Sequence, residues 1–387
     1  MINDPRTPNA FVRPVPPQSS GVRTVIKIIA AVLAILIALL LGLFVLFLIG
    51  VETGPVALLI GIVSATLPVP IYLMLVLWID RYESEPPWML ATAFFWGALV
   101  AVFFAFLINT ASDVAVQLLT NSASAGHTFG AVVSAPIVEE SAKALILFIF
   151  FFAKKDEFDG VIDGIVYAAM VGLGFAMTEN IQYYGKAVME GGGGTLTLVF
   201  ILRGFLAPFS HPMFTSMTGI GLGLARQSRN TLLKWVAPPF GLMAAMSMHS
   251  IWNGSGVLFG GGAFLLTYIL IMIPAFFIML VVIALALRRE GQIVREHLVS
   301  EFQGGLLTPD EYRRLCTIFG RMGMSFDALT RGGFGQWQTA RQLNQTASEL
   351  AFHRNRVARG IKAADAVQRE AAYRMALEDL LKRLRSK

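Results

Sequence analysis

Long runs of apolar residues, separated by short polar segments, fill the chain between residues 28 and 287. Each run is long enough to cross the roughly 30 Å hydrocarbon core of a bilayer as a helix. The pattern therefore predicts an all-α membrane protein, a polytopic bundle of about eight transmembrane helices. We expect these helices at residues 28–50, 55–79, 88–109, 130–153, 161–184, 196–224, 235–258 and 264–287.

The two ends of the chain have a different character. Residues 1–20 contain five prolines and no apolar periodicity, which predicts a disordered arm over residues 1–27. The run at 28–50 is too long for a signal-peptide core, so we expect a retained signal anchor. Residues 288–387 are polar, and Thr308-Pro309-Asp310-Glu311 is typical of a helix start. We thus expect a membrane-embedded domain over 28–287 and a helical cytoplasmic tail over 288–387.

The distribution of Lys and Arg predicts the orientation in the membrane. Basic residues fall in alternate loops, for example Arg81, Lys154 and Arg226, whereas the opposite loops contain Lys186 alone. Cytoplasmic loops carry the excess of basic residues, so we expect both termini in the cytoplasm. The tail holds 18 Lys or Arg against 11 Asp or Glu, a balance suited to anionic lipid headgroups. No nucleic-acid motif accompanies this charge, and we expect no nucleic-acid partner.

Composition narrows the class of protein further. Hydrophobic residues make up 55% of the chain and charged residues 14%, which is too apolar for a soluble domain. One cysteine, Cys316, and five histidines exclude a disulfide framework and a cysteine-based metal cage.

Charged residues lie inside one of the predicted spans. Glu139, Glu140 and Lys143 interrupt the run at 130–153. An acid at the centre of a spanning helix costs about 2.5–3.5 kcal/mol, so these side chains should face the bundle interior or a water-filled cavity. Glu139 and Lys143 are four residues apart and share a helix face. In this interpretation they neutralise each other and leave Glu140 as the carboxylate able to act.

Three further spans carry polar residues of the same kind. Glu179 lies in the fifth span, His211 follows Pro208 in the sixth, and His249 and Asn253 share a face of the seventh. A rise of about 1.5 Å per residue puts Glu139 and His249 roughly 14 Å below the outer boundary, Glu179 roughly 8 Å and His211 roughly 20 Å. The four spans thus bring these groups to the outer half or the middle of the bilayer.

This set of side chains suffices for metal-assisted hydrolysis of an amide. One carboxylate with two imidazoles is a ligand set of catalytic zinc, and a second carboxylate can take the proton of the attacking water. An amide one turn from a ligand can donate to the developing oxyanion. Other interpretations stay open, because the carboxylates could form a proton or cation relay and Asn253 could be packing glue. A transporter or a non-catalytic membrane scaffold would use the same residues.

Several motifs, in order along residues 70–255, resemble the PrsW family of intramembrane metalloproteases, which is related to the CAAX prenyl endopeptidases and bacteriocin-immunity-type membrane proteins. They are Asp80-Arg81-Tyr82-Glu83-Ser84-Glu85-Pro86, Glu139-Glu140-Ser141-Ala142-Lys143, Asp163 through Asn180, His211, and His249-Ser250-Ile251-Trp252-Asn253. The prenyl endopeptidases have histidine where this chain has Glu179, which favours the PrsW branch. The resemblance implies cleavage of single-span, anti-sigma-factor-like proteins near the extracytoplasmic side of a bacterial cytoplasmic membrane.

We therefore predict a metal-dependent endopeptidase acting on membrane-anchored proteins. Glu140 is the predicted general base and Glu139, held by Lys143, its neighbour, although the two roles could be exchanged. Asn253 is the predicted oxyanion donor or supporting residue. The predicted zinc ligands are Glu179, His211 and His249. Against a transporter, the chain shows no repeated halves of the kind found in many secondary transporters.

Overall fold

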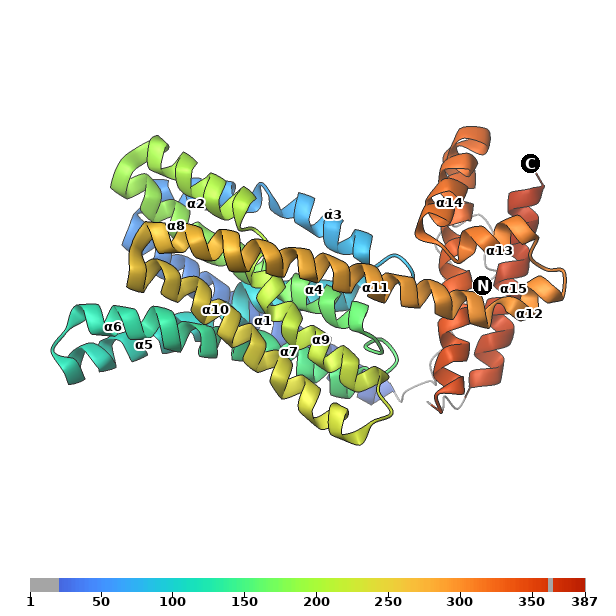
Figure 1. Cartoon of the computed structure of the whole chain (residues 1–387), viewed down its shortest axis with the longest axis horizontal. Helices are drawn as coiled ribbons and strands as arrows, with labels where there is room; N and C mark the ends of the chain where they lie inside the picture. The colour runs from blue at the N-terminus through green and yellow to red at the C-terminus, as the bar shows by residue number, and fades with distance from the viewer. Residues whose placement is uncertain (1–20, 361–364, 387) are drawn as a thin grey trace. The chain divides into compact units, whose positions relative to one another are not determined.

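The computed structural model describes residues 21–360 and 365–386, and it contains helices and no strand within those residues (Figure 1). The predicted all-α membrane fold is confirmed. Most of the predicted arm lies outside the described residues. Five helical stretches of the described chain are long and apolar enough to span a membrane: Thr24–Thr53, Pro55–Ile79, Pro87–Thr120, Val161–Gln227 and Gly260–His297. The predicted number of eight is not confirmed.

A glycine break in α8 (Val161–Ile201) explains part of this difference, and a second glycine break interrupts α10 (Thr231–Thr267). Helix α8 is non-helical at Gly191 and Gly192, and α10 is non-helical at Gly260. Gly192 has φ 61° and Gly260 has φ 76°, a left-handed conformation that glycine adopts without steric cost. Figure 1 shows the ribbon turning back at both breaks. The predicted spans at 161–184 and 196–224 therefore both lie in the single stretch Val161–Gln227, with the turn at Gly191 and Gly192 between them.

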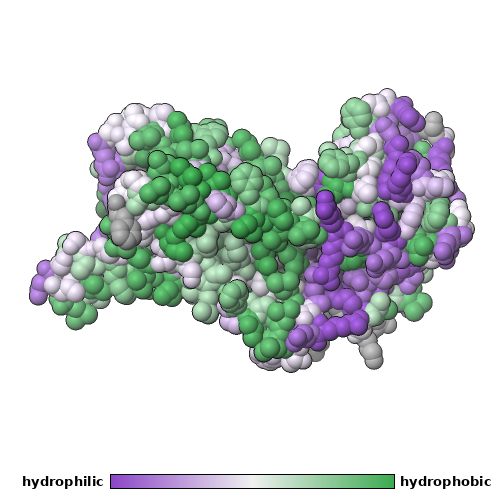
Figure 2. Space-filling view, in the orientation of Figure 1, coloured by the Kyte–Doolittle hydropathy of each residue, from purple (hydrophilic) through white to green (hydrophobic). Residues whose placement is uncertain are grey.

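The chain divides into two compact units. The membrane unit comprises Thr24–Asp80 and Glu85–Ile283. Its remaining helices are α1 (Gly21–Thr53), α2 (Pro55–Thr66), α3 (Val69–Ile79), α4 (Pro87–Phe95), α5 (Val102–Thr120), α6 (Ala123–Phe129), α7 (Ala135–Ala153), α9 (Ser210–Gln227) and the first part of α11 (Ile273–His297). Wider π-helical turns interrupt them at η1 (Trp96–Ala101), η2 (Gly130–Ser134), η3 (Leu202–Leu206) and η4 (Tyr268–Met272). Figure 2 shows apolar side chains over much of the visible face of these helices.

Helix α8 is the central helix of the membrane unit, with every residue from 161 to 176 buried. It packs closely on α9 through Gly164 and Gly219. A Cβ atom on either glycine would collide with the backbone carbonyl of the other. Small residues permit this close backbone approach between membrane helices, whose association depends on packing contacts. The contact fixes α8 beside α9, the two helices that carry Glu179 and His211.

The tail unit combines the described part of Ala284–Lys387 with Arg81–Ser84. It contains α12 (Val299–Gln303), α13 (Pro309–Leu315), α14 (Ile318–Ala358) and α15 (Ala366–Arg385). Thr308 caps α13 as the sequence predicts, since its hydroxyl accepts a hydrogen bond from the Glu311 amide. Arg354 binds both oxygens of Glu301, at 2.6 and 2.8 Å. Burial raises the pKa of Glu301, but the hydrogen bonds from Arg354 and Ser300 and the charge of Arg354 together leave the pKa below its ordinary value.

The membership of Arg81–Ser84 in the tail unit was not predicted. The Tyr82 side chain is buried there, and its hydroxyl donates to the Cys316 carbonyl at 3.4 Å. Arg356 forms an ion pair with Glu83 at 2.6 Å. We predicted that this motif belongs to the membrane-embedded domain because it directly precedes a predicted span. No periodicity in the tail indicated that it would enclose the loop.

Candidate metal and catalytic centre

The polar residues predicted from four separate spans converge in the membrane unit. Helix α7 supplies Glu139 and Glu140, α8 supplies Glu179, and α9 and α10 supply His211 and His249. The two imidazole rings lie 5.2 Å apart, nearly perpendicular to each other. Glu139, His211 and His249 are buried, and each offers a ligand atom within 4.8 Å of the others. We call these three residues the EHH group.

Glu140 is fully buried and its two oxygens accept three hydrogen bonds. Lys143 Nζ lies 2.8 Å and His249 Nδ1 3.1 Å from Oε1, and Thr215 donates to Oε2 at 2.9 Å. A carboxylate engaged in this way is held rigidly and orients the groups that donate to it. The arrangement differs from our prediction that Lys143 engages Glu139 and leaves Glu140 to act. The ammonium is closer to Glu140, since its distance to Glu139 Oε2 is 3.4 Å.

Hydrogen bonding fixes the proton positions on the two histidines. An ionised carboxylate accepts, so the Nδ1 of His249 carries the proton and Nε2 keeps its lone pair. This Nε2 lies 3.9 Å from Glu139 Oε2. His211 has partners on both nitrogens, Lys143 Nζ at 3.0 Å from Nδ1 and Glu179 Oε2 at 2.9 Å from Nε2. An ammonium can only donate, so Nδ1 accepts from Lys143 and Nε2 donates to Glu179.

Glu139 faces the two histidines and is loosely held. Besides the 3.4 Å contact with Lys143, Asn109 Nδ2 lies 3.4 Å from Oε1, and Ser134 donates to Asn109 at 3.0 Å. Sequence reasoning missed Asn109 and Thr215. Thr215 follows His211 by four residues and therefore shares its helix face, a spacing that could have found it. Asn109 gave a weaker signal, an amide at the end of an apolar run.

Glu179 lies at the edge of the centre, outside the EHH group. Its Oε2 receives the hydrogen bond of His211 and also pairs with Arg203, which in turn donates to Asn180 at 2.6 Å. One fifth of its side-chain surface is exposed, against 8% for Glu139. The structure thus groups Glu139 with the histidines, in the place that the sequence-based interpretation gave to Glu179. In the structure Glu179 instead pairs with Arg203 and accepts the hydrogen bond from Nε2 of His211.

The side-chain amide of Asn253 is not available to donate a hydrogen bond within the centre. Its side-chain amide donates to the Ala131 carbonyl at 2.9 Å, and Ser250 on the same helix donates to the Val132 carbonyl at 2.6 Å. Both bonds join α10 to the π-helical turn η2. The geometry therefore favours a packing role for Asn253 over the predicted oxyanion role. An amide between membrane helices often has this role.

Residues 85–279 match the family model described as PrsW family intramembrane metalloprotease. This region is just over half of the chain and contains every residue of the centre. The chain belongs to the PrsW family. Family membership agrees with the resemblance seen in the motifs, and the PrsW match begins after Arg81–Ser84.

The chain is similar to curated proteins named Protease PrsW. The identity is 33% over 147 residues with the protein of Geobacillus kaustophilus, covering 38% of this chain and 58% of the relative. With the Bacillus subtilis protein it is 32% over 158 residues, covering 41% and 65%. With that of Oceanobacillus iheyensis it is 29% over 195 residues, covering 50% and 82%. The chain thus spans less than two thirds of the first two PrsW proteins. No solved structure matches.

The PrsW family description implies a metal, and the EHH group can be tested for its fit. One carboxylate and two imidazoles form a donor set of catalytic zinc. The hydrogen bond from His249 Nδ1 to Glu140 orients Nε2 for a ligand, as carboxylates behind metal-binding histidines do. Three carboxylates face two cations, Lys143 and Arg203, so the centre carries one excess negative charge when the histidines are neutral. Donor types, spacing and charge therefore fit a divalent cation, which on His211 would take the Nδ1 lone pair in place of the hydrogen bond from Lys143.

Proposed function

We propose that the protein is a zinc-dependent endopeptidase that cuts membrane-anchored proteins. The observation that carries this proposal is the EHH group, buried inside a helix bundle beside two further carboxylates. Ionisable residues in that setting are costly and mark function. Membership of the PrsW family supports the same reaction class.

The geometry suggests a distinct role for each residue. Glu139, His211 and His249 would hold the metal, which supplies Lewis acidity toward water and toward the substrate carbonyl. Glu140 fixes the ring of His249. Glu179 is the carboxylate of the centre that keeps the largest exposed fraction, and it takes the proton as water attacks the carbonyl carbon. The C–N bond then breaks, and the same carboxylate returns the proton to the leaving amine.

The test is hydrolysis of a single-span peptide in vesicles that contain the purified protein. We expect about one zinc per chain, cleavage that a chelator abolishes and added zinc restores, and no cleavage by His249→Ala. The matched control is His127→Ala, which changes an exposed histidine in α6. A protein that carries no zinc and cuts in the presence of the chelator would refute the metal-dependent mechanism. Proton flux without cleavage would favour a transporter instead.

We further propose that the substrate is a single-span membrane protein of the anti-sigma-factor kind, cut near its extracytoplasmic end. The orientation inferred from the basic residues supports this side of cleavage. Arg226 donates to the Phe158 carbonyl at 3.0 Å, and Lys154 lies 5.0 Å from the Trp88 ring, so the basic side chains at the ends of α9 and α7 share one end of the bundle with the start of α4. That end would face the cytoplasm of a bacterial cell.

A reporter fusion tests this orientation. Alkaline phosphatase fused at Gly192 should be active, because the break in α8 would lie outside the cytoplasm. The same enzyme fused after Arg289 should be silent, because both termini and the basic tail would be cytoplasmic. Activity at Arg289 with silence at Gly192 would reverse the topology and the proposed side of cleavage.

A further inference from the structure

A break in the helical backbone separates η3 from α9 immediately before His211. Ala207 has φ −121° and ψ 31°, outside the helical region. Hydroxyls donate to two carbonyls at this break, Tyr268 to Leu206 at 2.9 Å and Ser210 to Ala207 at 3.0 Å. Non-helical backbone at membrane depth is tolerated where it is buried in protein or lines a cavity. The break at Ala207 lines a cavity of this kind.

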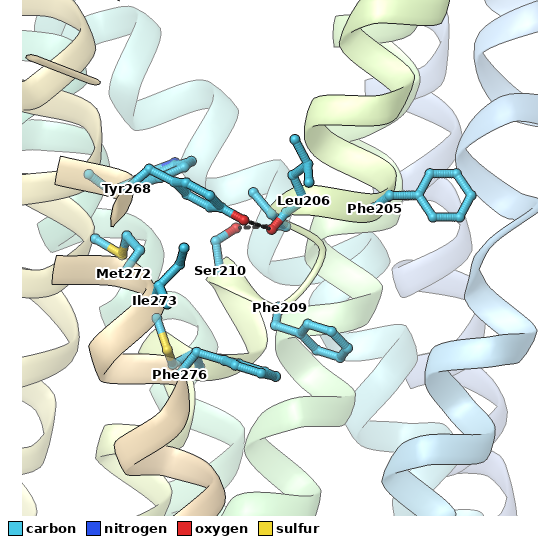
Figure 3. A pocket seen from close by; sticks show the side chains of 11 residues that line it. Phe205, Leu206, Phe209, Ser210, Tyr268, Met272, Ile273 and Phe276 are labelled. Carbon is cyan, nitrogen blue, oxygen red and sulfur yellow. Dashed lines mark hydrogen bonds between the residues drawn. The ribbon is translucent and has the colours of Figure 1, made fainter. Parts of the chain in front are cut away.

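The cavity between the break and the η4–α11 segment has a volume of about 240 Å³. Aromatic and methionine side chains form most of its wall, and Figure 3 shows the Tyr268 hydroxyl directed at Leu206 across its upper side. The rings of Phe209 and Phe276 lie 5.4 Å apart. Leu206 is half exposed, whereas Met272 is buried. The cavity is thus apolar inside, with two hydroxyls near the backbone break.

The wall of this cavity shares helices with the EHH group. Ser210 and Met213 line the cavity and flank His211 in the first turn of α9. Trp252 lines it from α10, three residues after His249 and therefore on a neighbouring part of the same helix face. A group bound in the cavity would be held by the same two helical turns that position both imidazoles.

The size of the cavity limits what can occupy it. Pockets for drug-sized ligands measure about 300–1,000 Å³, so this one is too small for such a ligand. A cavity of about 150 Å³ lined by apolar side chains already binds benzene. A volume between these values suits one large side chain, and the aromatic wall favours an apolar or aromatic one.

We propose that the cavity binds one large apolar side chain, of the phenylalanine or leucine class, from the substrate residue beside the bond that is cut. This inference rests on the proposed function, because it makes the cavity the specificity pocket of that reaction. The alternative occupant is a lipid acyl chain. The wall shares helical turns of α9 and α10 with both histidines, and this favours the substrate over a lipid chain.

Photocrosslinking tests the proposal without requiring hydrolysis. The chain carries Glu139→Gln to prevent cleavage and a photoreactive benzoylphenylalanine in place of Phe276, in phosphatidylcholine–phosphatidylglycerol vesicles. The probe is a synthetic alanine-rich spanning peptide with one phenylalanine, moved one position at a time. At one position we expect peptide adducts, reduced about fivefold or more when that phenylalanine is alanine. Lipid adducts alone, or equal capture of all peptides, would overturn the proposal.

Filling the cavity provides a second, independent measurement. Ala207 lines the cavity and has a negative φ, so Ala207→Phe should fill the space without backbone strain. Peptide capture should fall about fivefold or more, whereas Ala115→Phe on the exposed surface of α5 should leave it unchanged. A chain with the wild-type centre that crosslinks the peptide but never cleaves it would contradict the proposed function and support the pocket. Cleavage and capture that both survive Ala207→Phe would sink the pocket alone.

Discussion

Replacement of Glu139 by glutamine should abolish zinc binding, whereas replacement of Glu179 by glutamine should leave zinc bound and abolish hydrolysis. Glu139 belongs to the EHH group, and an amide is a poor substitute for an anionic ligand. Loss of this ligand should weaken zinc binding by more than the roughly 10–100-fold typical of supporting residues. Glu179 is the proposed proton acceptor, and its removal should lower kcat by about 10²–10⁴-fold. Metal analysis and peptide cleavage measure the two effects.

The same experiment distinguishes two sets of zinc ligands, one in which Glu139 joins the two histidines and one in which Glu179 does. Glu140→Gln should weaken zinc binding by about 10–100-fold, because it loosens the hydrogen bond that orients His249. Glu52→Gln is the matched control, since Glu52 is a half-exposed carboxylate that pairs with Lys186. Thermal unfolding in detergent identifies any variant that fails to fold. If Glu179→Gln loses zinc and Glu139→Gln retains it, the set predicted from the sequence is the correct one.

Removal of the Lys143 charge should destabilise the protein strongly. Lys143 is fully buried and contacts both Glu139 and Glu140, at 3.4 and 2.8 Å. Lys143→Met leaves two buried carboxylates without their cation, and breaking a buried pair in this way costs about 3–5 kcal/mol. Unfolding in detergent monitored by circular dichroism measures the loss. The double variant with Glu140→Gln should recover part of it, because one of the uncompensated charges is then gone.

A second ion pair with the same separation provides the control. Lys186 and Glu52 also lie 2.8 Å apart, but their side chains are 42% and 43% exposed. Lys186→Met should therefore cost about 0–1 kcal/mol, the usual worth of a solvated pair. Equal losses in the two variants would mean that burial does not govern the Lys143 interaction, and that water reaches the centre freely.

The residues of the centre could be predicted from the sequence, but their pairing could not. Charges and imidazoles inside apolar runs are conspicuous, and helical spacing assigns partners within one helix. Glu139 and Glu140 are adjacent, however, so they point about 100° apart around α7. Which of them lies on the Nε2 side of His249 and which on the Nδ1 side depends on the rotation of α7 against α9 and α10. That rotation is set by packing between distant segments, and so is the pairing of Arg203 with Glu179.

The helix breaks could not be predicted from the sequence, for a related reason. Glycine at 191–194 and 260–262 predicts flexibility, yet whether a helix stops or turns back depends on what covers it. The break at Ala207 has no glycine at its centre, and its carbonyls are bonded by Tyr268 and Ser210. Such partners come from a helix some sixty residues away or from the next turn, so local propensity does not reveal them.

The enclosure of Arg81–Ser84 by the tail unit changes what a truncated chain would be. A gene cut after the last apolar run would encode the membrane-spanning helices without the tail. The truncation would also remove Cys316 and Arg356, the partners of Tyr82 and Glu83. A tyrosine that is now 2% exposed would meet solvent, a few residues from where α4 begins. The tail therefore encloses a loop that is distant from it in sequence. A chain shortened to the membrane-spanning helices would need a redesigned Arg81–Ser84 loop.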